Sequence, residues 1–294
     1  MFFYAIDVLS QKSSEHFREF TNKQYKDFVK AIVNDDKVVI EKCISLIIQN
    51  TSLNSIDPNK LTSLDKLYIL LCLRSYNIAS KLNLNAQTKD EISISLTIDI
   101  NQILQTLEKL EISHIFEVNC DGITAKGTLP KSICSTNALE LVCTSIDELI
   151  IKDKTVILSD LTVSEKQFIL NNLPLTLVSK ITEFVYRQEK ILSSAPVFKF
   201  DTTKELTFDK EITLSLFNNS IIELIKVLFN TNLRDFYTTE YILYKKFSIP
   251  YEAVNNLTPA EINVYFDIIA KDIEQEKRDT DEQQQGTPIS SRPK

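Results

Sequence analysis

The sequence predicts an α+β protein with a mainly helical N-terminal part, a strand-rich middle and a C-terminal helical module that contains a β-hairpin. Three observations lead to this prediction. Apolar residues recur at three- and four-residue intervals at both ends of the chain, they alternate with polar residues in the middle, and the last stretch has Ile289 as its one large apolar residue. We expect parts spanning residues 1–85, 86–158 and 159–277, with the hairpin near 197–215 and a disordered tail over 278–294.

The composition excludes several classes of function. The 294 residues are 43% hydrophobic and 25% charged, which is typical of a globular protein. The 33 Lys and Arg residues are scattered and are outnumbered by 40 Asp and Glu, so we expect no nucleic-acid partner. With three glycines in the chain, of which Gly122 and Gly127 lie in the part expected to fold, there is no phosphate-binding loop and no nucleophile elbow.

The N-terminal part is predicted to contain three helices after a start that does not resemble a leader. Asp7 interrupts the first apolar run, and no stretch reaches the roughly 18 apolar residues of a membrane span, so we expect a soluble, non-secreted chain with no membrane partner. The first helix is predicted over residues 13–34 and the second over 36–49. Thr62 is a suitable cap for the third, which is so apolar that we expect it to be central. The apolar positions of the first two helices are Phe17, Phe20, Phe28 and Ile32, and Val39, Cys43, Leu46 and Ile47.

The middle of the chain changes to strand periodicity. Residues 91–100 alternate, which predicts a half-buried strand. The pair Asp121 and Gly122 is a favoured tight-turn sequence between two β-prone runs, so residues 114–129 are predicted to form a hairpin. Residues 141–158 fit either helix or strand at each end. The alternating apolar residues of the first strand are Ile92, Ile94, Leu96, Ile98 and Ile100.

The last part returns to helix. Thr162 and Glu165 form a predicted capping box, and the next helix has the apolar stripe Leu177, Ile181, Phe184 and Val185. Residues 197–215 alternate around a polar turn near Thr202 and Thr203, which predicts a β-hairpin. A final helix is predicted to begin with Thr258 as its N-cap, Pro259 in its first turn and Glu261 as the capping acid.

The chemistry-bearing residues do not form a recognisable active site. The cysteines Cys43, Cys72, Cys120, Cys134 and Cys143 contain no CxxC pair, which favours free thiols in a reducing cytoplasm. His16, expected on the first helix, and His114, at the entry to a strand, are the two histidines, so we expect no metal, no cofactor and no enzymatic activity. If the chain were an enzyme, His114, Glu117 and Asp121 would be the group to test.

Two segments are candidate partner-binding surfaces. Tyrosine is enriched at protein interfaces because it combines apolar area with a polar tip. The tyrosine-rich segment is Tyr237, Tyr241, Tyr244, Phe247 and Tyr251. Packing in the core is the more ordinary role of such aromatic residues, and both interpretations stay open. The apolar strand positions Ile92, Ile94 and Leu96 are the second candidate, as an edge strand that could pair with another chain.

Four segments, in order along the chain, resemble those of one known family. LTSLDKLYILLCLRSYNIA places Asp65 before Tyr68 and ends in the pair Leu73 and Arg74; ISISLTIDINQIL is followed by DGITAKGTLPKS with its closing Pro130. The third is DLTVSEKQFILNNLPLTLVSKITEFVYRQEKILSSAPVFKF, and the terminal module contains Asn232, Leu233, Tyr237, Pro259, Glu261 and Tyr265. Together they resemble the baseplate hub assembly proteins of T-even-type contractile-tailed bacteriophages.

The resemblance implies a non-enzymatic role in building the central hub of the tail baseplate. The partners would be other tail and baseplate proteins, including the tape-measure protein. The chain would act as a structural protein in the virion or as an assembly chaperone in the host cytoplasm. The cysteine pairs and the tryptophan that family members often carry are absent here, so no metal-stabilised hairpin is expected. A generic cytosolic adaptor unrelated to tails is the alternative function, and an enzyme is the third.

Overall fold

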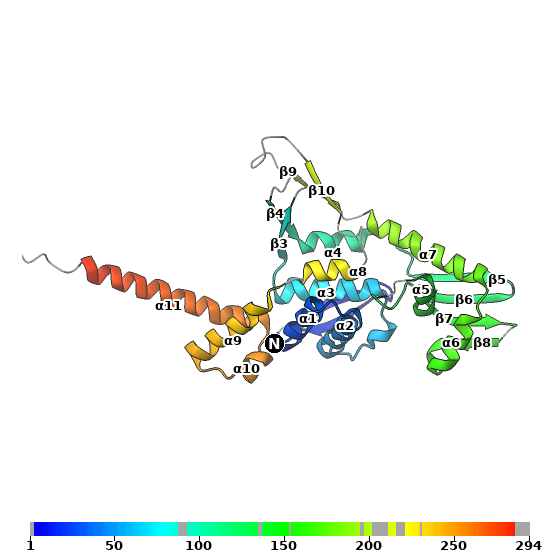
Figure 1. Ribbon diagram of the computed structural model, residues 1–294, viewed down its shortest axis with the longest axis horizontal. Coiled ribbons are helices and arrows are strands. Elements are labelled where there is room, and N and C mark those ends of the chain that lie inside the picture. The colour runs from blue at the N-terminus through cyan, green and yellow to red at the C-terminus, as the bar shows by residue number, and fades with distance from the viewer. Residues whose placement is uncertain are drawn as a thin grey trace, which may run out of the picture.

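The computed structural model describes residues 3–87, 93–134, 137–152, 154–194, 197–201, 211–215, 221–229 and 231–285. It confirms the α+β fold. Figure 1 shows an elongated molecule with a helical body at its centre, a small sheet lobe on one side and a long helix projecting from the other. Within these residues, no helix combines the length and the apolar character that crossing a membrane requires.

The chain begins with a hairpin instead of a helix. Strand β1 (Phe3–Val8) pairs antiparallel with β2 (Ser13–Arg18), and α1 (Asn22–Val33) begins only after Thr21, which caps it in a box with Gln24. The helix predicted from residue 13 is therefore wrong over its first third, and His16 lies on a strand. Strand β2 is stabilised by hydrogen bonds to residues 3–8, and the helical spacing of its apolar residues does not reveal this pairing.

Helix α2 (Lys37–Thr51) begins after the N-cap Asp36, close to the predicted start. Its buried face is different from the predicted one, because Val39 and Leu46 are exposed and Cys43 is half buried. The buried isoleucines form a continuous stripe at helical spacing, and this stripe is shifted by one residue from most of the predicted apolar positions. The buried side chains of this stripe are Ile40, Ile44, Ile47 and Ile48.

The third helix is central, as predicted. After a short 3-10 turn (Pro58–Lys60), α3 (Ser63–Asn77) begins with a complete capping box between Thr62 and Asp65. Almost every residue of α3 is buried, because β1, α2, α4 and α8 all contact it. In Figure 1 it runs through the middle of the helical body.

A second hairpin follows, formed by β3 (Lys81–Gln87) and β4 (Ser93–Asp99). The predicted strand is confirmed from Ser93 onward. Ile100 does not continue it, because Asp99 caps α4 (Ile100–Lys109), an amphipathic helix that the strand prediction missed. Ile92 and the side chains of Ile94 and Leu96 lie outside the described residues.

The sheet lobe contains the predicted turn at Asp121 and Gly122. Strands β5 (Ile115–Cys120) and β6 (Ile123–Thr128) are joined by these two residues, both with positive φ, as a type I′ hairpin turn requires. Residues 141–158, which fit either helix or strand, form the end of helix α5 (Ala138–Ser145) and strands β7 (Ile146–Ile151) and β8 (Lys154–Ile157). The sheet is antiparallel, in the order β5-β6-β7-β8.

Two helices complete this lobe. A 3-10 turn (Leu158–Asp160) leads to α6 (Val163–Asn171), which has the predicted capping box of Thr162 and Glu165. Helix α7 (Leu175–Ser193) packs against β5 and α5. Its predicted apolar stripe is confirmed, with Leu177, Ile181 and Val185 buried and the Phe184 ring centroid 5.3 Å from that of Phe116.

The remaining elements are one hairpin and four helices. Strands β9 (Val197–Asp201) and β10 (Glu211–Ser215) pair as predicted, whereas the turn residues Thr202 and Thr203 lie outside the described residues. The helices are α8 (Ile221–Leu228), α9 (Leu233–Phe247), α10 (Tyr251–Asn256) and α11 (Pro259–Gln285). Thr258 and Glu261 cap α11 as predicted. Residues 278–285 of the expected tail belong to this helix, and residues 286–294 are not described.

The buried residues of the described segments form three cores that do not follow the chain order. The largest contains β1, α1 to α4 and α8, the second contains the sheet with α5 to α7, and the third contains α9 to α11. Helix α8 returns to the first core after the chain has built the sheet lobe, and the Arg74 Nε donates to the Leu228 carbonyl over 2.7 Å. The domain boundaries expected at residues 85, 158 and 277 remain predictions.

Candidate protein-binding surface

Three tyrosines lie along one side of α9. Tyr237, Tyr241 and Tyr244 are spaced by four and three residues, which places them on one face of a helix, and each is about half exposed. Tyr251, at the start of α10, is exposed to a similar degree, and its ring stacks on Tyr244 with centroids 5.4 Å apart and planes at 16°. We call these four residues the tyrosine surface. It presents large, rigid apolar area whose hydroxyl groups can still reach solvent or a partner.

A tight reversal brings the two stacked rings together. Ser248 ends α9 in the left-handed conformation, with φ of 55°, and Pro250 precedes α10. Phe247, predicted as part of the same contact segment, is half buried instead and packs against Tyr265 of α11 with ring centroids 5.2 Å apart. Phe247 therefore supports the surface from inside the third core.

A buried ion pair attaches the tyrosine surface to the helical body. Lys26 of α1 donates to the Glu240 carboxylate of α9 and, over 3.0 Å, to Asn255 Oδ1 of α10. Both charged side chains are nearly inaccessible, at 11% and 8% exposure. The Lys26 ammonium also lies 5.6 Å from the Tyr237 ring centroid, within cation–π range. One lysine thus fixes α9 and α10 relative to α1.

Tyr25, next to Lys26, provides the apolar part of the same attachment. Its hydroxyl shares a 2.8 Å hydrogen bond with Thr231, and its ring meets Phe236 edge to face with centroids 5.1 Å apart. Burial raises the pKa of Tyr25, so the phenol is neutral and can donate. A backbone bond of 2.7 Å from Asn22 to Leu257 completes the contact. The sequence gives no signal for these contacts, because the partners are more than 200 residues apart.

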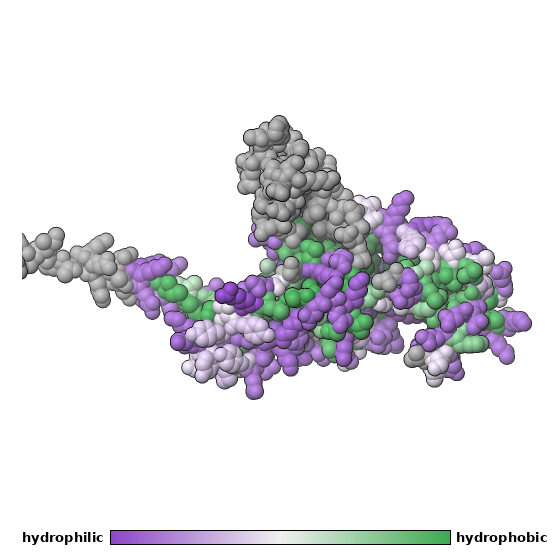
Figure 2. All heavy atoms as spheres, in the orientation of Figure 1, coloured by the Kyte–Doolittle hydropathy of each residue, from purple (hydrophilic) through white to green (hydrophobic). Residues whose placement is uncertain are grey.

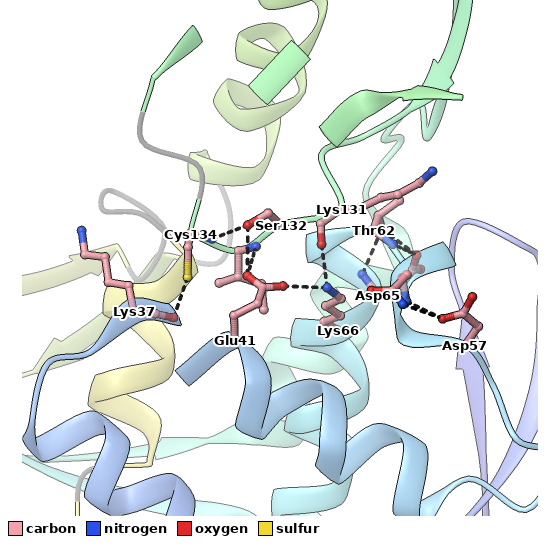
Figure 3. A network of polar contacts seen from close by, with 11 residues as sticks. Lys37, Glu41, Asp57, Thr62, Asp65, Lys66, Lys131, Ser132 and Cys134 are labelled. Atoms are coloured by element: carbon pink, nitrogen blue, oxygen red, sulfur yellow. Dashed lines mark hydrogen bonds and ion pairs between the residues drawn. The ribbon is translucent and has the colours of Figure 1, made fainter. Parts of the chain in front are cut away.

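A second polar network joins the sheet lobe to the helical body, as Figure 3 shows. Glu41 of α2 accepts from Lys66 Nζ over 2.7 Å, from Ser132 Oγ over 3.1 Å and from the Ile133 amide over 2.7 Å. Lys66 also donates to the Lys131 carbonyl over 2.7 Å. These bonds tie the connection between β6 and α5 to α2 and α3.

The neighbouring groups of this network are also structural. The fully buried Asp65 accepts from Thr62 and from both the amide and the hydroxyl of Ser10. Cys134 Sγ donates to the Lys37 carbonyl over 2.9 Å. Burial and the nearby Glu41 raise the pKa of the Cys134 thiol to about 12, so it is not ionised at neutral pH. A neutral thiol is a poor nucleophile.

The residues named for a hypothetical active site are not brought together. His114 precedes β5 and Asp121 follows it, so about seven extended residues, on the order of 20 Å, separate them. Glu117 lies on the strand between them and pairs with Lys126 at 3.7 Å. Across the described ranges, no three His, Cys, Asp or Glu side chains form a group that could hold a metal.

The structure describes the backbone of the strand that was predicted to bind a partner through its edge. Strand β4 pairs with β3 in a sheet of two strands, so within the described residues its other edge has no strand beside it. The contacts of the side chains predicted to bind there, Ile92, Ile94 and Leu96, are outside the described residues.

Comparison with known protein families gives a match over most of the chain. A family model described as T4 bacteriophage base plate protein matches residues 1–218. No curated protein and no solved structure matches the chain. The matched residues include the sheet lobe and most of the helical body, and they end before α8, so the tyrosine surface lies outside them.

Proposed function

Because this chain belongs to the T4 bacteriophage base plate protein family, we propose that it helps to build the central hub of the tail baseplate by binding other tail proteins. A baseplate protein works in the tail of the virion. The hub position, and a role either as a resident structural component or as an assembly chaperone in the host cytoplasm, are the finer parts of the proposal. The family match over residues 1–218 is the observation that carries it.

We propose binding, and not catalysis, as the mode of action. His114, Glu117 and Asp121 are spread along a strand, and the Cys134 thiol is neutral and hydrogen bonded. The buried ion pairs Lys26–Glu240 and Lys66–Glu41 join separate segments of the chain, so their geometry supports a rigid scaffold. A rigid scaffold binds a partner with little loss of conformational entropy.

The tyrosine surface is the proposed contact for a hub or tape-measure protein. Its four rings lie on a module that Lys26 and Tyr25 hold in place, so they are presented without further ordering. Aromatic side chains of this kind are frequent hot spots of protein interfaces. This proposal gives the C-terminal module the partner-binding role and the family-matched part the role of scaffold.

Mass spectrometry of salt-washed particles and of infected-cell lysate tests the proposal. Stoichiometric peptides in particles would establish a resident component, whereas peptides only in lysate, co-purifying with hub or tape-measure proteins, would establish a chaperone. Changing Tyr241 and Tyr244 together to Ser should lower this association by at least about tenfold, since one hot spot contributes about 2 kcal/mol. Tyr186→Ser is the matched control, because Tyr186 is exposed to the same extent on α7. Absence of the wild-type chain from both fractions would contradict the proposal.

A further inference from the structure

Helix α11 leaves the body of the molecule soon after it begins. Its 27 residues span about 40 Å at 1.5 Å per residue. Figure 1 shows that only its first part lies beside α9 and α10, and the remainder projects away from every other labelled element. Ile262, Tyr265 and Phe266 belong to the third core and hold this first part.

The apolar stripe of α11 continues past the point where its own chain covers it. Ile269 and Ile273 follow Ile262 and Phe266 by seven residues each, so they lie on the same side of the helix. Ile273 is 41% exposed. Val264 and Ile268 are exposed as well, but the helical spacing puts them on nearly the opposite side of the helix, so they are not part of this stripe. Figure 2 shows hydrophobic atoms between hydrophilic ones along this projecting helix. An apolar stripe on a helix normally faces a packing partner, so an exposed stripe indicates a site where another molecule binds.

The charge of the helix indicates what that partner is. Residues 259–285 contain eight acidic and three basic residues, a net charge of −5 within a chain whose total is −7. Two copies of α11 placed side by side would bring these acidic residues together, and charges of the same sign repel one another at short range. A basic partner would be attracted along the same length and would also be guided toward it.

We propose that the projecting part of α11, residues 264–278, binds a basic amphipathic helix of another protein through Ile269 and Ile273. The apolar face of the partner covers these two isoleucines, and its lysines or arginines face the acidic side chains of α11. This site goes beyond the proposed function, since it lies outside the family-matched residues and on a different helix from the tyrosine surface.

Fluorescence anisotropy with the full-length chain tests this assignment. The probe is a labelled 21-residue peptide of Leu and Lys with Leu at helical spacing, and the comparison peptide has Glu in place of every Lys. We expect the Lys peptide to bind at least about tenfold more tightly than the Glu peptide, and added salt to weaken it. Equal affinity for the two peptides would overturn the assignment.

Variants of the chain separate this helix from other acidic surface. The Ile269→Ser and Ile273→Ser double variant keeps the charge and should weaken Lys-peptide binding by at least about tenfold. Val38→Ser removes a more exposed apolar side chain from α2 and should leave it unchanged. Asp272→Asn with Glu274→Gln keeps the apolar stripe and should reduce the salt dependence, which gives a second test if the Ile variant loses helix by circular dichroism.

Two outcomes would overturn the proposal independently of the tyrosine surface. Unchanged peptide affinity in both double variants would show that α11 is not the binding site. Sedimentation equilibrium that shows a dimer in the wild type and a monomer in the Ile269→Ser and Ile273→Ser variant would show that a second copy is the occupant. The Tyr241→Ser and Tyr244→Ser variant should bind the Lys peptide normally, so the two surfaces are tested separately.

Discussion

Lys66 is the buried charge that holds three distant segments together. Lys66 is part of α3, and its side chain is 4% exposed. Its ammonium donates to Glu41 of α2 and to the carbonyl of Lys131, which lies between β6 and α5. Removing both charges from water is unfavourable, so such a pair adds little net stability compared with apolar packing. Removing Lys66 is different, because the largely buried Glu41 carboxylate then keeps the neutral donors Ser132 and Ile133 but loses its opposite charge.

Lys66→Met should therefore lower the free energy of unfolding by about 3 kcal/mol, measured by urea denaturation. Adding Glu41→Gln to that variant should cost much less than Glu41→Gln alone, because the carboxylate that had lost its counter-charge is then gone. Arg187→Met is the control. It breaks the exposed pair with Glu183 and should stay within about 0.5 kcal/mol of wild type. Strictly additive effects of the Lys66 and Glu41 substitutions would contradict the coupling.

At the level of single elements, the sheet lobe depends on one glycine for close packing. Gly127 lies at an irregular register between β6 and β7, close to the backbone of Ser145, the last residue of α5. A Cβ at this position would lie far inside contact distance of the Ser145 carbonyl oxygen and 2.8 Å from the Phe116 ring. Gly122, in contrast, has open space around it. A glycine is favoured there because the backbone has a positive φ of 77°.

Gly127→Ala should destabilise the protein by at least about 2 kcal/mol, because backbone and an aromatic ring must both move. Gly122→Ala should cost only about 1 kcal/mol, the penalty of a left-handed conformation for a residue with a Cβ. Urea denaturation of the two variants gives the comparison. A Gly127→Ala variant as stable as Gly122→Ala would show that the α5 end can shift away from the strand.

The elements that the sequence predicted correctly are those with local signals. Thr62, Thr162 and Thr258 cap helices through residues three positions away, and the Asp121–Gly122 turn requires only its own backbone angles. The errors concern segments whose structure depends on contacts with another element. Residues 13–18 are a strand because they pair with residues 3–8, and α2 buries a different face because of what packs against it.

The candidate site shows the same limit. The density of tyrosines indicated a possible contact segment, without deciding between surface and core. The four tyrosine rings are about half exposed, whereas Phe247 is half buried because Tyr265 of α11 packs against it. No local pattern links Lys26 to Glu240, since 214 residues separate them. The expected absence of an active site, and the role of the edge strand, stay predictions.

At the scale of the whole molecule, α1 connects two of the three cores. Its apolar face belongs to the first core, and Lys26 with Tyr25 reaches the helices of the third. The sheet lobe is attached separately, through the Glu41 and Lys66 network. The two attachments share no residue, so the C-terminal module and the sheet lobe should be able to loosen independently.

Hydrogen exchange of Lys26→Met tests this independence. The substitution leaves Glu240 buried without its partner, so α9 to α11 should exchange at least about tenfold faster, while β5 to β8 keep the wild-type rate. Lys30→Met is the matched control on the same helix, because its pair with Asp27 is exposed, and it should leave both regions unchanged. Faster exchange in β5 to β8 as well would show that the three cores unfold as one unit. Selective loosening would mean that the tyrosine surface and α11 move together as one module relative to the family-matched part of the chain.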